Sequence, residues 1–259
     1  MRTISVIALK GGVGKTTISV GLARAFQGMG MRVGLLDLDY RSPTSLVLLN
    51  MENMKVGRGD GDSLIPPTLD GLSVFSMGFV WPPEKAVMIE DELAMHDVEQ
   101  ILTPGIIAWP PLDILIIDSP PSSSGVVLAL LKAPSLTSVI IVSQPSSLSR
   151  AALLRTMDLL AETQVPVYGI ISNQGVDERG QNRFDLQDQD IIGLAALHNI
   201  PWCFCIPHTR TLAPHFDGLA QCILSTEPVL LPKPKEPKGV AWDRIIAVAQ
   251  KLTEPKPSG

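Results

Sequence analysis

The chain has 259 residues, of which 45% are hydrophobic and 18% charged, and 21 Lys and Arg against 26 Asp and Glu give a formal net charge of −5. This length and apolar fraction are ample for one large domain with a single core. The acidic balance argues against a non-specific nucleic-acid binder, whose domain is normally basic. Three cysteines, an odd number in a long chain, exclude a disulfide framework. We see no secretory signal and no apolar run of the roughly 18–20 residues that a membrane helix needs, and therefore expect a cytoplasmic protein.

Apolar, β-branched runs alternate along the chain with longer stretches of helical spacing. The expected strands are residues 3–9, 32–38, 72–77, 112–118, 137–143, 165–172 and 200–206. The expected helices are residues 15–29, 91–102, 125–132, 148–163 and 188–198. Most of these strands are apolar almost throughout, which is typical of strands buried on both faces. The alternation predicts right-handed βαβ units, and hence an α/β fold with a mostly parallel sheet and helices on both faces.

Two polar segments interrupt this alternation, and we expect residues 55–63 to form a mobile surface loop and residues 176–187 a functional loop. We assign residues 1–230 to one domain, residues 231–239 to a semi-rigid Pro/Lys linker, and residues 240–259 to a last amphipathic helix and a frayed tail. The apolar stripe of that helix consists of Trp242, Ile245, Ile246, Ala249 and Leu252. Few basic residues flank it, which favours packing against protein over binding to a membrane.

A glycine-rich segment, KGGVGKTT at residues 10–17, follows the first expected strand and opens the first expected helix. The residues expected to bind a nucleotide there are Gly11, Gly12, Val13, Gly14, Lys15, Thr16 and Thr17. The glycines allow positive φ, so that backbone N–H groups can turn onto phosphate oxygens at a helix N-terminus. Lys15 can reach the β- and γ-phosphates, and the Thr16 hydroxyl can complete the shell of a Mg²⁺ ion. The sequence therefore predicts a phosphate-binding loop for Mg-ATP.

This loop departs from the general pattern G-x-x-x-x-G-K-[ST], because Leu9 stands where a glycine is expected and Lys10 immediately precedes Gly11. It resembles the deviant Walker A motif of the ParA/MinD/Mrp group of P-loop ATPases. The resemblance implies a homodimer in which Lys10 reaches the nucleotide of the partner subunit. A cation supplied in this way neutralises charge that develops on the transferred phosphoryl group. The alternative is a solvated lysine at the start of a loop.

Three aspartates end expected strands at the sheet edge where ligands bind in such folds. By the resemblance, Asp39 orients the attacking water and Asp37 lies nearer the Mg²⁺, although both could simply cap the following turn. Asp118 ends the apolar run LDILIID, the form of a Walker B strand, and is expected to hold Mg²⁺ through a water. Ser122 and Ser123 stand where the second switch segment of Mrp proteins usually has Gly and Thr.

Two further residues match the adenine-binding segments of the family. Asn173, at the end of VYGIISN, matches the position whose amide reads the adenine edge, and Pro207 matches the loop that packs against the base. An asparagine at this place can also be an ordinary turn residue.

The resemblance covers roughly residues 1–225 and is closer to Mrp than to ParA or MinD. It implies an ATP-dependent homodimer that serves a client metalloprotein or metallochaperone, either in iron–sulfur cluster carriage or in nickel insertion. Mrp scaffold proteins carry C-x-x-C after the adenine-reading segment, but residues 174–187 hold no cysteine here. Cys203 and Cys205 lie two apart in an expected strand, so their thiols share one face and could chelate a soft metal or a cluster. The alternative, which the apolar strand favours, is that they simply pack in the core.

We therefore expect a homodimeric, Mg-ATP-dependent switch ATPase that hydrolyses ATP slowly under the control of a partner and acts in metallocentre assembly. The alternative is a ParA/MinD-like positioning ATPase that acts on a membrane, DNA or a protein complex. The net charge and the weak terminal helix count against membrane and nucleic acid as partners. A P-loop kinase is a third possibility, although Lys10 is unexpected there.

Overall fold

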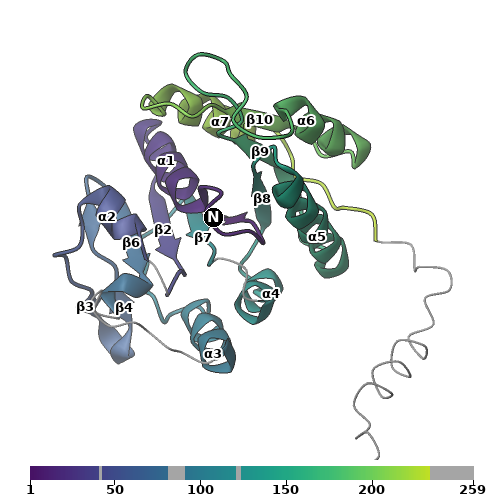
Figure 1. The fold of residues 1–259 in the computed structure, drawn as a ribbon. Helices are drawn as coiled ribbons and strands as arrows, with labels where there is room; N and C mark the ends of the chain where they lie inside the picture. Colours follow the sequence, from purple (N-terminus) through teal and green to yellow (C-terminus); the bar gives the residue numbers. More distant parts are fainter. Residues whose placement is uncertain (41–42, 81–90, 121–123, 234–259) are drawn as a thin grey trace, which may run out of the picture.

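The computed structural model describes residues 1–40, 43–80, 91–120 and 124–233 (Figure 1). The expected terminal helix at residues 240–259 and most of the linker before it lie outside this part of the chain. So do Ser122 and Ser123 of the expected second switch segment.

A single sheet of eight strands carries the fold, in the order β10-β9-β8-β1-β7-β2-β6-β5. The strands, in that order, are Cys203–Ile206, Val167–Asn173, Ser138–Ser143, Arg2–Ile7, Ile114–Asp118, Val33–Asp37, Leu72–Ser76 and Thr68–Leu69. All neighbouring pairs are parallel except β5 with β6. The predicted α/β fold with a mostly parallel sheet is thus confirmed, and each of the seven expected strands is present.

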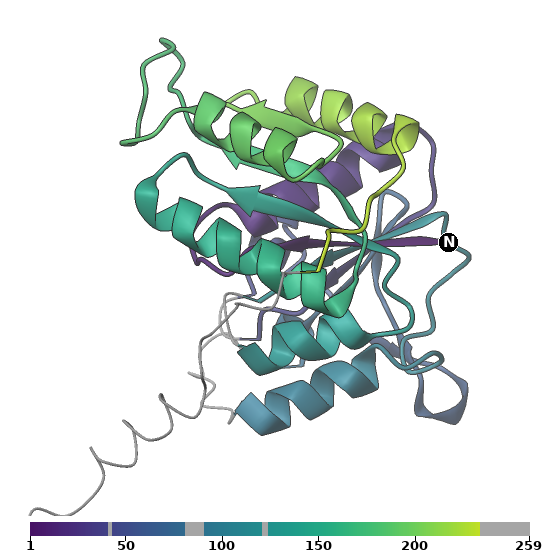
Figure 2. The same cartoon turned by 90° about the vertical axis from the view of Figure 1, so that its right-hand side faces the viewer.

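Helices cover both faces of this sheet (Figures 1 and 2). They are α1 (Lys15–Gly28), α2 (Ser45–Leu49), α3 (Asp91–Ile101), α4 (Ser124–Lys132), α5 (Ser147–Thr163), α6 (Asp188–Leu197) and α7 (Ala213–Ser225). The pleat of β7 shows how the faces are divided: Ile114 and Ile116 pack with α1, α2 and α7, while Leu115 and Ile117 pack with α3 and α4. A third apolar cluster joins α5 and α6 to β8 and β9.

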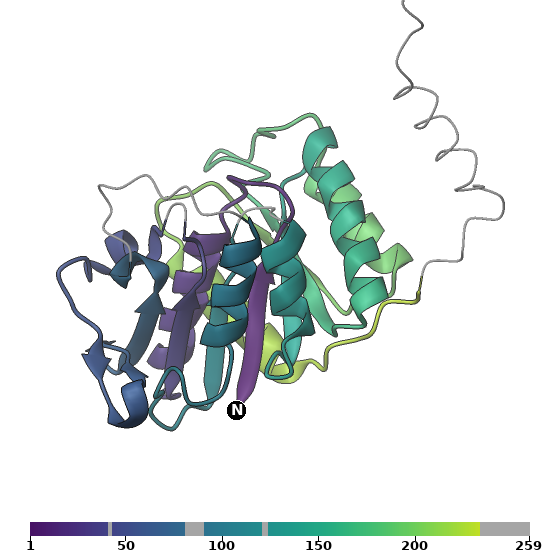
Figure 3. The same ribbon diagram turned by 90° about the horizontal axis from the view of Figure 1, so that it is seen from below.

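The described helices are too short or too polar to cross a membrane. The phosphate loop and the N-terminus lie at opposite ends of β1, and α3, α4 and α5 lie side by side across one face of the sheet (Figure 3).

Several elements differ from the expectations. The expected surface loop at residues 55–63 contains β3 (Gly57–Arg58), which pairs with β4 (Leu64–Ile65) around a short 3₁₀ turn at Asp60–Asp62. The expected strand at residues 200–206 begins only at Cys203. Helices α2 and α7 were not expected, although four buried residues of α7 have helical spacing, namely Phe216, Leu219, Ala220 and Ile223. Residues 176–187 have neither helix nor extended strand, as expected of a loop.

Candidate nucleotide-binding site

The loop between β1 and α1 has the backbone of an anion-binding turn. Gly12 and Gly14 have φ of 73° and 98°, in the left-handed region that favours glycine, whereas Gly11 has no positive φ. A Cβ at Gly14 would lie 2.3 Å from the Asn173 amide nitrogen. Helix α1 begins at Lys15 with no side-chain cap and no acidic residue in its first turn. Its first N–H groups and its positive dipole end therefore remain available for an anion.

Lys15 is buried beside this turn. Burial lowers the pKa of its ammonium group, while the charges of Asp118 and Asp39 oppose the shift. The structure thus places Lys15 and Asp39 together, as the sequence predicted, at the carboxyl edge of the sheet. A cation that is desolvated and near carboxylates gains strongly from a phosphate that approaches it.

Asp37 and Asp118 are adjacent in the register of β2 and β7, and both are fully buried. Burial raises the pKa of Asp37 to about 6 against hydrogen bonds from Ser45, Ser76 and the Asp39 N–H. The Asp39 N–H donates to Asp37 Oδ1 at 2.9 Å, the Ser76 hydroxyl to Oδ2 at 3.1 Å, and the Ser45 hydroxyl to the same oxygen. Both oxygens of Asp37 already accept hydrogen bonds from protein donors. Asp37 is therefore better suited to supply negative charge beside the site than to bind a metal ion directly.

Asp118 has a different environment. Burial, followed by the charge of Asp37, raises its pKa to about 7. Its Oδ1 accepts a hydrogen bond from the Ser19 hydroxyl at 3.0 Å, and the Thr16 hydroxyl also donates to its carboxylate. Its Oδ2 is buried and has no hydrogen-bond partner within the described chain. A buried carboxylate oxygen without a donor, next to a threonine hydroxyl, fits the oxygen donor set that a hydrated Mg²⁺ ion requires.

Lys10 makes a hydrogen bond within its own chain. Its Nζ donates a hydrogen bond of 2.8 Å to the hydroxyl of Ser149, in the first turn of α5. Ser146 caps the same helix by accepting from the Ser149 N–H at 3.2 Å. Lys10 is therefore held within its own chain, and it must leave Ser149 before it can contact a partner subunit.

Asn173 and Pro207 both line a small hollow beside α1. The Asn173 amide donates to the carbonyl of Val13 in the phosphate loop at 2.8 Å, and this hydrogen bond ties the loop to the end of β9. The hollow is also lined by Thr17, which the sequence placed in the phosphate loop, and by Ile18, Gln174, Ile206, His208, Thr209, Leu212 and Phe216. Helix α1 lies far in the sequence from β9, β10 and α7, which explains why their meeting point was not predicted.

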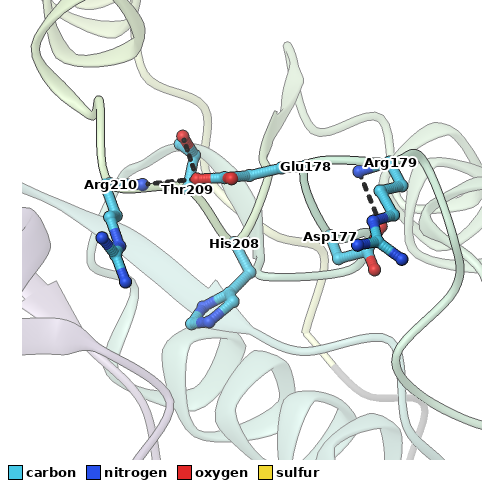
Figure 4. A pocket seen from close by; sticks show the side chains of 6 residues that line it. All are labelled: Asp177, Glu178, Arg179, His208, Thr209 and Arg210. Atoms are coloured by element: carbon cyan, nitrogen blue, oxygen red, sulfur yellow. Dashed lines mark hydrogen bonds between the residues drawn. The ribbon is translucent and has the colours of Figure 1, made fainter.

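Next to this hollow lies a larger one of about 380 Å³, between the loop at residues 176–187 and the segment after β10 (Figure 4). Glu178 reaches across and accepts hydrogen bonds from the Arg210 N–H at 3.1 Å and the Thr209 hydroxyl at 3.4 Å. The other residues that line this larger hollow are Asp177, Arg179 and His208. The sequence identified the loop as functional but did not identify these side chains.

Cys203 and Cys205 share one side of β10, and a hydrogen bond joins their thiols. Across the residues that the structure describes, no three His, Cys, Asp or Glu side chains gather closely enough to hold a metal ion. The two thiols therefore have no third ligand of these types within the described chain.

A strand, a glycine turn and an uncapped helix, with a buried lysine and a buried aspartate beside them, define a P-loop nucleoside triphosphatase fold and site. Residues 1–217 match a family model described as ParA: NUBPL iron-transfer P-loop NTPase. The chain belongs to this family, which confirms the resemblance to the ParA/MinD/Mrp group. Nucleoside triphosphate hydrolysis is the general activity of P-loop NTPases.

Individual proteins agree with this assignment. The chain is 34% identical over 167 residues to an iron–sulfur cluster carrier protein of Helicobacter pylori, a match that covers 64% of this chain and 45% of that protein. The chain thus spans about half the length of the curated relatives it matches. A nucleotide-binding protein of Archaeoglobus fulgidus, solved with ADP, is 27% identical with a TM-score of 0.68, over 87% of this chain and 89% of that one. The cell division ATPase MinD of Pyrococcus furiosus, 17% identical with a TM-score of 0.61 over 86% and 98% of the two chains, shares the fold.

Proposed function

We propose that this protein is a homodimeric, Mg-ATP-dependent switch ATPase that acts in metallocentre assembly, with an iron–sulfur cluster as the favoured cargo. The observation that carries the nucleotide part is the buried Oδ2 of Asp118, which has no hydrogen-bond partner among the described residues and belongs to a carboxylate that interacts with Thr16 and Lys15. The cargo is supported by family membership and by relatives named iron–sulfur cluster carrier proteins. Nickel insertion into a client metalloprotein is the second cargo class in the proposal.

In the proposed hydrolysis, the backbone N–H groups of residues 11–17 and the Lys15 ammonium bind the β- and γ-phosphates. Thr16 and Asp118 would hold Mg²⁺, and Asp37 would add negative charge behind them; a bound ion would neutralise phosphate charge. Asp39 accepts a hydrogen bond from the attacking water and orients it. The water oxygen bonds to the γ-phosphorus, the bond to the β,γ-bridging oxygen breaks, and both water protons leave with the released phosphate as dihydrogen phosphate. ADP and inorganic phosphate are the products.

The proposed dimer gives Lys10 two alternative positions. In one chain alone, Lys10 donates to Ser149. In the dimer it leaves that hydroxyl and reaches the phosphates of the partner subunit's nucleotide. Because the intrachain hydrogen bond must break first, basal hydrolysis is slow, and a client that favours the dimer accelerates it. Dimer opening after hydrolysis then releases the client or its cargo.

The test of the nucleotide part is a pair of substitutions. Lys15→Ala should abolish nucleotide binding, and Asp39→Ala should leave ATP binding intact, stop turnover and trap a dimer that light scattering detects. Full ATPase activity in Lys15→Ala would refute the P-loop assignment, and unchanged turnover in Asp39→Ala would remove its catalytic role. The cargo part is tested separately by anaerobic cluster reconstitution and transfer to an apo iron–sulfur protein, followed by visible absorbance. No ATP-dependent transfer would overturn the cargo while leaving the ATPase in place.

A further inference from the structure

The thiol pair on β10 is separate from the nucleotide site. β10 is the last strand of the sheet, and its side chains alternate: Trp202 and Phe204 pack toward the core that contains α1 and α7, while Cys203 packs toward α5 and α6. Cys205, two residues on, shares the side of Cys203. Both thiols are half-buried, so a small ion can reach them from solvent.

The surroundings of the pair favour a bound cation. The Cys203 thiol lies within hydrogen-bonding reach of Cys205. The Asp188 carboxylate, at the start of α6, lies near both sulfur atoms and accepts a hydrogen bond from the Ser172 hydroxyl. Two thiolates next to this carboxylate repel one another unless a cation lies between them.

The donor set selects the kind of cation. Tetrahedral zinc or iron sites need four ligands, and within the described residues no third His, Cys, Asp or Glu, Asp188 included, is close enough to bind the same ion as the two thiols. A disulfide is also disfavoured, because Cα atoms two apart on a strand are about 6.6 Å apart, near the upper limit of about 6.8 Å for a disulfide. Two thiolates alone suit a soft, monovalent d¹⁰ ion, for which two-coordinate geometry is ordinary.

A second chain is not needed to complete such a site. The proposed homodimer joins two chains through their phosphate loops, which follow β1. β10 lies three strands from β1, about 14 Å away at the usual strand spacing.

We propose that Cys203 and Cys205 form a bis-thiolate site for one soft monovalent cation of the Cu(I) class. Binding breaks both S–H bonds, forms two sulfur–copper bonds and releases two protons to solvent, with no change of oxidation state. The site does not depend on ATP, so it stands independently of the function proposed above.

The test is anaerobic titration of the full chain with Cu(I), delivered from its bicinchoninate complex and followed by loss of that complex's colour. The wild-type chain should take up one ion. Cys203→Ser and Cys205→Ser should each weaken binding by more than about a hundredfold, because even outer-shell changes at metal sites cost about ten- to a hundredfold. Cys222→Ser, on α7, is the matched control and should bind like wild type, as should Lys15→Ala.

Far-ultraviolet circular dichroism and thermal melting of each serine variant show whether it has folded. Wild-type affinity in either folded β10 variant would overturn the proposal, and so would loss of binding in Cys222→Ser. Titration with Co²⁺ supplies an independent arm: intense visible bands of a tetrathiolate centre, together with dimerisation, would mean that two chains share a four-ligand site, and would also overturn it.

Discussion

At the scale of single residues, the site is defined by two buried carboxylates that share one neighbourhood. Asp37 has its oxygens occupied by protein donors, whereas Asp118 keeps one oxygen without a donor within the described chain. Without a bound metal ion, the two carboxylates repel one another, and taking up a proton reduces this repulsion. A bound Mg²⁺ removes the need for that proton, so ion binding and protonation compete at Asp118.

The first prediction concerns pH. The folded-state pKa values of about 6 and about 7 lie above the ordinary value of 3.8, so the folded chain holds protons that the unfolded chain releases. The free energy of unfolding should therefore fall as pH rises from about 4 to about 7. Urea unfolding across this range measures the slope, and Asp118→Asn should make it shallower. Saturating Mg²⁺ with ADP should also make this slope shallower in the wild type. A slope in Asp118→Asn as steep as that of the wild type would contradict the raised pKa of Asp118.

The second prediction concerns Gly14, the residue immediately before α1. Gly14→Ala forces a Cβ into the left-handed region, against the Asn173 amide, at a cost of about 1–2 kcal/mol from the backbone alone. The melting temperature and the affinity for a fluorescent ATP analogue should both fall. Gly28→Ala is the control, because Gly28 ends the same helix with open space around it. Equal behaviour of the two variants would argue against the tight packing of the loop on Asn173.

At the scale of elements, the first turn of α5 connects the phosphate loop to the loop at residues 176–187. Ser149 accepts from Lys10, while the Ser147 N–H and hydroxyl donate to Asp185 of that loop. Both contacts lie within one helical turn. If Lys10 moves toward a partner subunit, Ser149 loses its hydrogen bond to Lys10, while Ser147 in the same turn stays bonded to Asp185 of the loop at residues 176–187.

The third prediction tests this connection. A hydrogen bond to a charged group contributes about 1.5–3 kcal/mol, so Ser149→Ala should release Lys10 and shift ATP-dependent dimerisation to about tenfold lower protein concentration. Analytical ultracentrifugation with a non-hydrolysable ATP analogue measures the shift. Ser225→Ala, an exposed helical serine on α7, is the matched control. Dimerisation unchanged from that control would mean that Ser149 does not restrain Lys10.

The elements also show how far the sequence could lead. Strands β1, β2, β7 and β8 were predictable because strands buried on both faces are apolar without interruption, and the P-loop because its residues are contiguous. The partner of Lys10 was not, because Ser149 lies 139 residues further along the chain and its position depends on the packing of α5. The serines that donate hydrogen bonds to Asp37 were not predictable either: Ser45 comes from α2, which the sequence did not reveal, and Ser76 from β6.

At the scale of the whole molecule, the proposed mechanism requires each subunit to complete the other's site. Lys15 acts on the nucleotide of its own chain, and Lys10 acts on that of the partner. Substitution of either lysine should therefore remove activity for a different reason: Lys15→Ala loses the nucleotide, and Lys10→Ala keeps it but lacks the cation supplied in trans.

The fourth prediction follows from mixing these two variants. In a mixed dimer, the Lys10→Ala chain binds ATP and receives an intact Lys10 from the Lys15→Ala chain, so one site is complete. If subunits pair at random, half of the dimers are mixed and each has one working site, so an equal mixture should recover about a quarter of the wild-type ATPase rate. Each variant alone, at the same total concentration, is the control. A mixture as inactive as its components would show that Lys10 acts within its own chain, because a lysine that works in cis cannot be restored by a neighbour.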